Sequence, residues 1–230
     1  MKIHLHLLVL VSLLFFYENK SEKSLQIISE TTKNQTFSET KVKGNLIAEK
    51  RIAHQSKANF NVVVSNIKGD LNKDGVADLI TVKQDTVNEN KPYRLQIFLS
   101  QADKKLKLFL SSDTAIVAKY PNGNNGFSST TLFTGIVIKM GTFIINHELI
   151  RGSFSHQFRF QNNKFELIGY RSAGVSPPDI EEIDFNLSTG NKITKRIPIG
   201  GDKVKSIEKS KQIIRPLPNL NSFEPYEYQY

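Results

Sequence analysis

Apolar and polar residues alternate along much of the chain after residue 60, as they do in β-strands with one packed face and one exposed face. In 154–161 the sequence FSHQFRFQ places an aromatic residue or a histidine at every second position. Val, Ile, Phe, Tyr and Thr, which favour strands, dominate the apolar runs. These runs predict strands over 60–67, 79–83, 93–99, 106–110, 134–139, 142–150, 154–161, 165–170, 183–187 and 192–197.

Short connectors rich in turn-forming residues join these runs in pairs, for example Met140-Gly141 and Asn162-Asn163-Lys164. Such connectors predict antiparallel hairpins. No window of useful length shows the period of a helix. We therefore predict a mostly β fold, in which antiparallel hairpins or a meander form a single sheet-based domain.

The first residues have the layout of a secretory signal peptide, because Lys2 precedes an apolar stretch over 3–17 and polar residues follow at once. This stretch of about 15 residues is short for a membrane span, which needs roughly 20. We expect export to the periplasm or the cell exterior, and no transmembrane helix after this segment. Phe15, Phe16 and Tyr17 are large where cleavage favours small residues, so retention by an uncleaved segment stays open as an alternative.

Composition divides the chain into four parts. We assign residues 1–20 to a signal peptide, 21–55 to a polar linker, 56–200 to the β-rich domain and 201–230 to a basic and aromatic C-terminal extension. The chain has no Cys, which excludes disulfides, thiolate metal sites and Cys nucleophiles.

Positive charge gathers towards the C-terminal end of the chain, whose formal net charge is +9. Residues 192–215 contain eight Lys or Arg residues against Asp202 and Glu208. A stretch of this kind can contact phosphates or anionic lipid head groups. The alternative is a solvated face with no partner. We expect a cell-envelope protein or an anionic surface as the partner, rather than nucleic acid.

The sequence GDLNKDGVADLI over 69–80 sets carboxylate or amide side chains at alternate positions and follows the third with a glycine. This spacing matches the calcium-loop pattern D-x-[DN]-x-[DN]-G. Calcium takes about six to eight oxygen ligands, and alternate side chains on a tightly curved loop can converge on one point. We predict a calcium site formed by the side chains of Asp70, Asn72, Asp74 and Asp78 and by the carbonyl of Val76.

Thr81 stands where a helix–loop–helix site would place a bidentate Glu. We therefore expect strands on both sides of the loop and a weak affinity, about 10⁻⁴ to 10⁻³ M as in extracellular modules. The alternative is a polar turn held by its own Asp and Asn side chains without a metal.

The stretch GDLNKDGVADLITV resembles the calcium loops of FG-GAP and VCBS repeats, the strand–loop–strand units of integrin-type β-propellers. The resemblance implies the same calcium ligands as the spacing. The chain has no second copy of D-x-N-x-D-G, so we do not expect a complete β-propeller. Together with RLQIFL, FRFQNNKFELIGY and DFNLSTG, the stretch also resembles a family of uncharacterised exported bacterial proteins, which implies the location and the fold rather than a function.

Other candidate chemistry is weaker. His147 and Glu148 begin an H-E-x-x-H-like stretch, but Arg151 stands where the second His of a zinc protease is required and the segment is predicted to be a strand. His156 shares an apolar face with phenylalanines, which indicates a hydrogen-bonded core histidine. We predict an exported, non-catalytic binding or scaffold protein. An enzyme, such as a hydrolase with an unrecognised site, and an anionic-surface binder acting through 192–215 are the alternatives.

Overall fold

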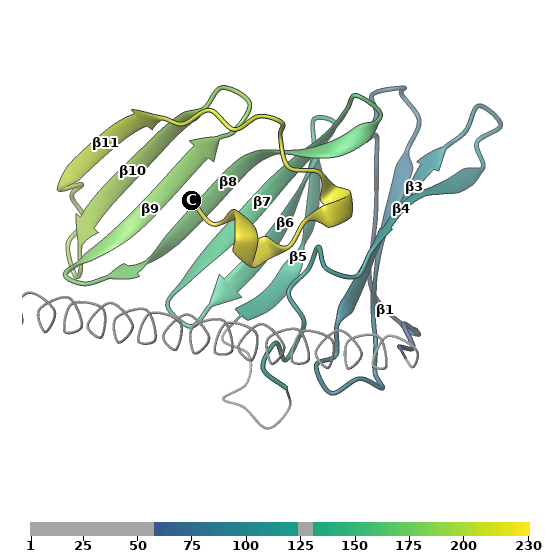
Figure 1. The fold of residues 1–230 in the computed structure, drawn as a ribbon, viewed down its shortest axis with the longest axis horizontal. Coiled ribbons are helices and arrows are strands. Elements are labelled where there is room, and N and C mark those ends of the chain that lie inside the picture. The colour runs from purple at the N-terminus through teal and green to yellow at the C-terminus, as the bar shows by residue number, and fades with distance from the viewer. Residues whose placement is uncertain (1–57, 124–130) are drawn as a thin grey trace, which may run out of the picture. The chain divides into compact units, whose positions relative to one another are not determined.

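The chain forms two antiparallel sheets, seen in a computed structural model that describes residues 58–123 and 131–230 (Figure 1). The four-stranded sheet contains β1 (Val62–Gly69), β2 (Asp78–Gln84), β3 (Tyr93–Ser100) and β4 (Leu106–Ser112). The seven-stranded sheet contains β5 (Thr131–Lys139), β6 (Thr142–Leu149), β7 (Gly152–Gln161), β8 (Lys164–Ser176), β9 (Asp179–Asn186), β10 (Asn191–Pro198) and β11 (Ser206–Lys211). Two short 3-10 helices follow, η1 (Leu220–Ser222) and η2 (Pro225–Tyr228). The signal peptide and the linker predicted for residues 1–55 lie outside the described residues.

Each sheet is a meander, because within each sheet every strand pairs with its neighbours in the sequence, and β4 and β5 are the edge strands at which the chain passes from one sheet to the other. The mostly β fold built from antiparallel hairpins is confirmed, and neither sheet closes into a propeller. The predicted strands correspond to β1–β10, although β8 continues to Ser176, well beyond the predicted 165–170, and β9 begins at Asp179, well before the predicted 183–187. Strand β11 was not predicted because its sequence, SIEKSK, has one apolar residue. All six residues are exposed on a strand that has one neighbour, so the hydrophobic pattern of a packed strand is absent there.

An aromatic layer covers one face of the seven-stranded sheet. Phe143, Phe158 and Phe185 are fully buried on β6, β7 and β9. The segment after β11 crosses this face, where the yellow η1 and η2 lie over the sheet in Figure 1. Phe223 is also fully buried, and its ring centroid lies 4.9 Å from that of Phe158. Residues beyond 200 thus contribute a strand and core side chains, so the β-rich fold continues past the boundary assigned from composition.

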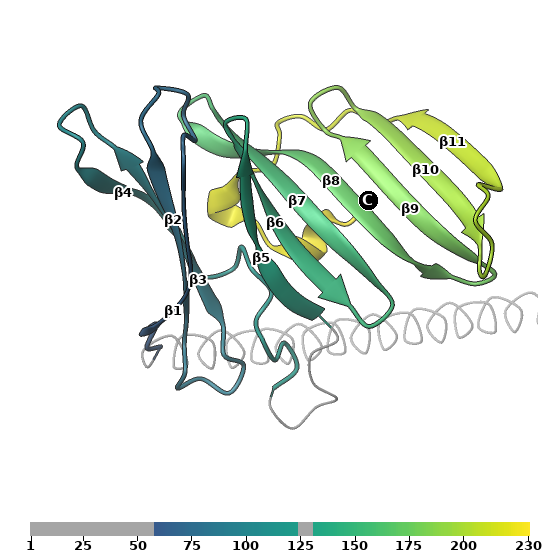
Figure 2. The same cartoon turned by 180° about the vertical axis from the view of Figure 1, so that it is seen from behind.

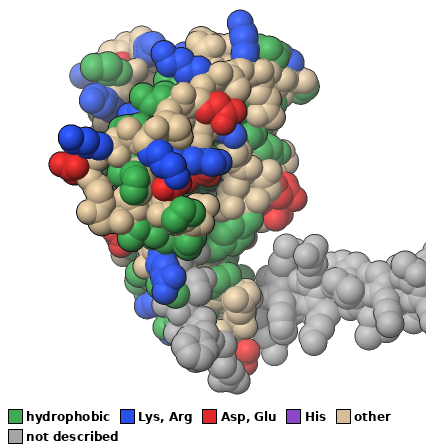
Figure 3. All heavy atoms as spheres, turned by 90° about the vertical axis from the view of Figure 1, so that its left-hand side faces the viewer, with side chains coloured by type: hydrophobic (Ala, Val, Ile, Leu, Met, Phe, Trp, Pro, Cys, Tyr) green, Lys and Arg blue, Asp and Glu red, His purple; other side chains and the backbone are tan. Residues whose placement is uncertain are grey.

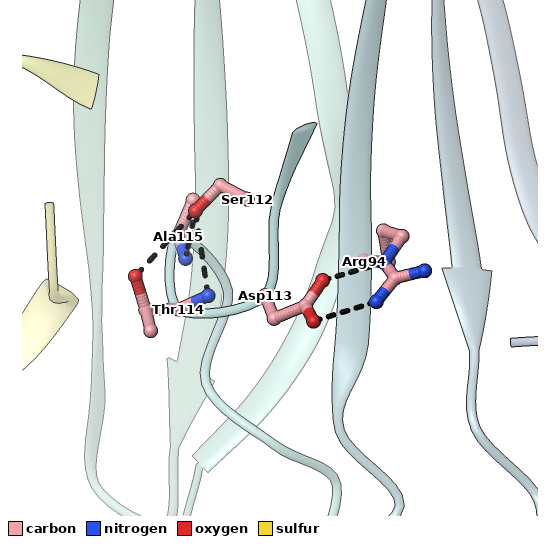
Figure 4. Close-up of polar contacts among 5 residues, drawn as sticks. All are labelled: Arg94, Ser112, Asp113, Thr114 and Ala115. Atoms are coloured by element: carbon pink, nitrogen blue, oxygen red, sulfur yellow. Dashed lines mark hydrogen bonds and ion pairs between the residues drawn. The ribbon is translucent and has the colours of Figure 1, made fainter. Parts of the chain in front are cut away.

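A short turn after β4, drawn in Figure 4, is hydrogen-bonded to β3 and to the C-terminal segment. The hydroxyl of Ser112 accepts the backbone N–H of Thr114 at 3.3 Å and of Ala115 at 3.2 Å. The Thr114 hydroxyl donates to the carbonyl of Phe223 at 2.8 Å. Arg94 holds the other side of the turn through two bonds to the carboxylate of Asp113, at 2.6 and 2.7 Å. This turn brings the buried Ala115 into the core.

The opposite face of the seven-stranded sheet is turned towards the viewer in Figure 2. Its side chains are mostly polar, since they alternate with the aromatic ones along each strand. No helix within residues 58–123 and 131–230 has the length and apolar character needed to cross a membrane.

Candidate metal centre

The predicted calcium ligands lie in the loop that joins β1 to β2, whose last paired residues are Gly69 and Asp78. The backbone turns sharply here, with φ of 64° at Lys73 and 83° at Gly75. Both values belong to the left-handed region, which glycine tolerates without strain and lysine does not. The strands on both sides of the loop are as the sequence predicts.

The loop's own side chains accept its backbone N–H groups. Asp70 accepts from Lys73 at 2.6 Å through Oδ1 and from Gly75 at 3.0 Å through Oδ2. Asn72 Oδ1 accepts from the N–H of Asp74 at 3.1 Å, and its amide donates to Asp74 Oδ2 at 2.8 Å. These bonds hold the loop in a tight curve, and they are of the kind expected for the alternative, a polar turn held by its own Asp and Asn side chains.

Asp78 has a different environment from the other predicted ligands because it is fully buried. Its Oδ2 accepts the N–H of Leu71 at 2.8 Å, and its Oδ1 accepts the N–H of Ser100 at 2.8 Å. The Ser100 hydroxyl donates to the Ala77 carbonyl at 2.6 Å. Asp78 therefore ties the start of the loop to the end of β3, a contact that sequence spacing does not reveal.

The donor set has the chemistry that calcium prefers, because every candidate ligand is an oxygen. Among the described residues, no three His, Cys, Asp or Glu side chains converge in a position to hold a metal ion. The oxygens are turned towards backbone N–H groups, and a carboxylate oxygen that accepts one such bond keeps a further lone pair. Asp74 is exposed and Asn72 half-buried, so both can turn towards a shared centre without disturbing the core.

The loop lies at the junction of the two sheets. Leu71 is buried in the hydrophobic core between its polar neighbours. A Cβ placed on Gly69 would lie 2.7 Å from Cγ2 of Ile138 on β5, and one placed on Gly141 would lie 2.6 Å from Cε of Lys73. The loop therefore packs closely on the β5–β6 hairpin, and any ligand that orders it also orders this junction.

Two histidines are buried in the aromatic layer. Burial lowers the pKa of His156 to about 4, against the opposing effect of its Nε2 contact with the Tyr228 carbonyl at 2.9 Å. Burial and the nearby His156 lower the pKa of His147 to about 3. His147 stacks on Phe154, with ring centroids 4.7 Å apart. Both imidazoles are neutral at pH 7, and the core role expected for His156 agrees with its contacts.

The basic segment 192–215 is divided between the two faces of the seven-stranded sheet. Strand register places Lys195 and Lys209 on the polar face, and Lys192 and Arg196 on the other. Arg196 pairs with Glu181 at 3.3 Å, and Lys205 pairs with Asp179 at 3.1 Å. Figure 3, which faces the β9–β11 end, shows Lys and Arg side chains interspersed with Asp and Glu. The segment is thus not one continuous cationic patch.

The polar face of the seven-stranded sheet is hollowed at its centre. Two adjoining hollows of about 530 and 520 Å³ share Asn146, Ser155, Arg171 and Asp184. Both hollows are lined by residues of β6 to β9, among them the long side chain of Arg171 on the central strand β8. The alternation of Ser, Gln and Arg along β7 predicts a polar face, but its hollow shape depends on neighbouring strands and could not be predicted from one strand.

No family model, curated protein or solved structure matches this chain. The fold and the loop themselves define its class, a two-sheet antiparallel β protein with an oxygen-rich hairpin loop at the junction of its sheets.

Proposed function

We propose that this chain is an exported, non-catalytic binding or scaffold protein of the cell envelope, and that one calcium ion stabilises its fold. The observation that carries the calcium proposal is the placement of alternating oxygen donors on one short hairpin loop at the sheet junction. When bound, calcium would neutralise carboxylates that otherwise repel one another. The ligands would be the side chains of Asp70, Asn72, Asp74 and Asp78 and the carbonyl of Val76.

A structural role for the ion is supported by what surrounds the loop. Leu71 is buried in the core, and the bonds of Asp78 reach β3. The native loop gathers ligands that the unfolded chain scatters, so binding would add directly to the free energy of unfolding.

A binding or scaffold role is supported by the polar face, whose hollows of about 530 and 520 Å³ present hydrogen-bonding side chains on a sheet. His147 and His156 lie in the aromatic layer, where each contacts backbone groups and aromatic rings.

Export is supported by the layout of residues 1–20. Mass spectrometry of exported protein that lacks these residues would agree with it, whereas an intact Met1 on cytoplasmic protein would contradict it.

Thermal unfolding of the full chain tests the calcium proposal. At a free calcium concentration tenfold above the dissociation constant, the stabilisation is RT ln 11, about 1.4 kcal/mol, or roughly 3 to 6 °C in Tm for a chain of this size. Magnesium should give a smaller shift because it tolerates irregular coordination poorly.

Two variants locate the effect. Asp74→Ala should abolish the calcium shift, because it removes a charged ligand. Asp103→Ala is the matched control, since Asp103 is an exposed aspartate in the β3–β4 turn that pairs with Lys105, and it should retain the shift. A Tm that responds to neither calcium nor chelator would refute the calcium site.

A further inference from the structure

A third hollow, of about 420 Å³, lies where β7 and β8 meet the segment after β11, and we name it the arginine hollow. Three cations line it, Arg159, Lys164 and Arg215, together with the single carboxylate of Glu166. Lys164 pairs with that carboxylate at 2.9 Å. Among the described residues, neither arginine forms an ion pair with a carboxylate.

Arg159 faces Glu166 directly across the β7–β8 register, yet the two do not form an ion pair among the described residues. The Nε of Arg159 instead donates to Oε1 of Gln161 at 2.7 Å, and its Nη2 donates to the hydroxyl of Ser188 at 3.4 Å. The amide of Gln161 in turn donates to Glu166. Gln161 thus separates the guanidinium from the carboxylate while fixing the direction of both.

Arg215 is held by carbonyl oxygens. Its Nη1 donates to Leu187 at 3.1 Å and to Ile214 at 2.6 Å, and its Nη2 donates to the Ser188 carbonyl at 2.7 Å. Ser188 is therefore a partner of both arginines, through its hydroxyl for Arg159 and through its carbonyl for Arg215. One residue holds two like-charged groups in the same hollow.

Donor groups remain on both guanidiniums. A guanidinium has about five N–H groups and carries its charge at any physiological pH. Arg159 uses two of them in its bonds to Gln161 and Ser188, and Arg215 uses three on carbonyl oxygens. Two fixed guanidiniums with spare donors form the arrangement that binds carboxylate, phosphate or sulfate groups in a fork.

We propose that the arginine hollow binds an oxyanion, namely a phosphate, sulfate or carboxylate group carried by a small molecule or a polymer. Arg159 and Arg215 are the ligand-binding residues, and Gln161 and Ser188 position them. The site is separate in sequence and contacts from the calcium loop, so the two proposals stand or fall independently.

The test is an NMR titration of the full chain with inorganic phosphate, inorganic sulfate and acetate in calcium-free buffer. Sodium chloride keeps the ionic strength constant, so that general screening does not change. We expect saturable shifts at the backbone amides of Ser188 and its neighbours. The probe that binds most tightly identifies whether the group is tetrahedral or planar.

Variants separate a formed site from diffuse attraction. Arg159→Gln should weaken binding of the preferred probe at least about tenfold, as expected for the loss of charged hydrogen bonds. Arg151→Gln removes an equal charge from the turn between β6 and β7, where Arg151 is exposed and lines none of the hollows described above, and it should change the affinity less than about twofold. If Arg159→Gln does not fold, Arg159→Lys keeps the charge and loses the fork, and it should still weaken binding severalfold.

Two outcomes would overturn the proposal. One is the lack of saturable shifts with any of the three anions. The other is equal weakening by the Arg159 and Arg151 variants, which would mean that the anions respond to net charge alone.

Discussion

The buried carboxylate of Asp78 should stabilise the fold without any metal. In Asp78→Ala, the backbone N–H groups of Leu71 and Ser100 both lose their acceptor in a buried place. A buried donor left without a partner costs about 1 to 3 kcal/mol, so the free energy of unfolding should fall by about 2 to 6 kcal/mol. Asp78→Asn keeps one acceptor oxygen and should lose about half as much.

Asp74→Ala is the matched comparison, because it removes the same functional group from the same loop. Asp74 is exposed, and water can satisfy the Val76 N–H that it accepts at 2.8 Å. We expect a change within about 0.5 kcal/mol, in either direction, since the variant also relieves repulsion among the loop's carboxylates.

Urea unfolding in the presence of a chelator measures both variants without a contribution from calcium. The slope of the free energy against urea should stay the same, so that a lower midpoint reports a loss of stability. If the two alanine variants unfold at the same urea concentration, Asp78 does not anchor the loop in the way that its hydrogen bonds indicate.

Three further predictions concern the aromatic layer and the basic segment. Burial lowers the pKa of His147 to about 3 and of His156 to about 4, so below pH 6.5 only the unfolded chain takes up their protons. The free energy of unfolding should be at its full value above pH 6.5 and fall by up to about 1.4 kcal/mol per histidine per pH unit down to about pH 4. His156→Gln should remove about half of that slope, which acid unfolding curves measure. Phe223→Ala should cost about 3 to 5 kcal/mol in urea unfolding, because the side chain is fully buried, whereas Phe223→Leu should cost markedly less; equal losses would contradict the packing argument. If the segment 192–215 contacts anionic surfaces, retention on anionic vesicles should fall with salt and on changing Lys203, Lys205, Lys209 and Lys211 to Gln, and unchanged retention would leave only a solvated face.

The sequence predicts the strands well because each depends on its own local pattern. Alternation in 154–161 reflects a strand with an aromatic face and a polar face, which is how β7 is placed. The tight connectors at Met140-Gly141 and at Asn162-Asn163 require positive φ, which the structure has at all four residues. These signals lie within a few residues of one another, so they can be read from the chain alone.

Features that depend on distant contacts could not be predicted in this way. Phe223 follows a stretch rich in Lys and Pro, and nothing near it in the sequence indicates that it packs on Phe158. The arginine hollow likewise depends on Arg215 reaching the carbonyls of Leu187 and Ser188. Among the candidate calcium ligands, spacing predicts the oxygens but not that Asp78 is buried against Ser100.

The order of the strands has a consequence for how the chain reaches its native state. Because every strand pairs with its sequence neighbours, both sheets can assemble progressively from the N-terminal side while later residues are still being made. The aromatic layer cannot be completed in the same way, since its core residues Leu220 and Phe223 come after all the strands of the described residues. Until the C-terminal residues arrive, Phe158 lacks the ring of Phe223 and Phe185 lacks the ring of Tyr230, which lies 4.9 Å from it in the native fold. Packing of the C-terminal residues on the aromatic layer is therefore the step that completes the hydrophobic core and stabilises the assembled sheets.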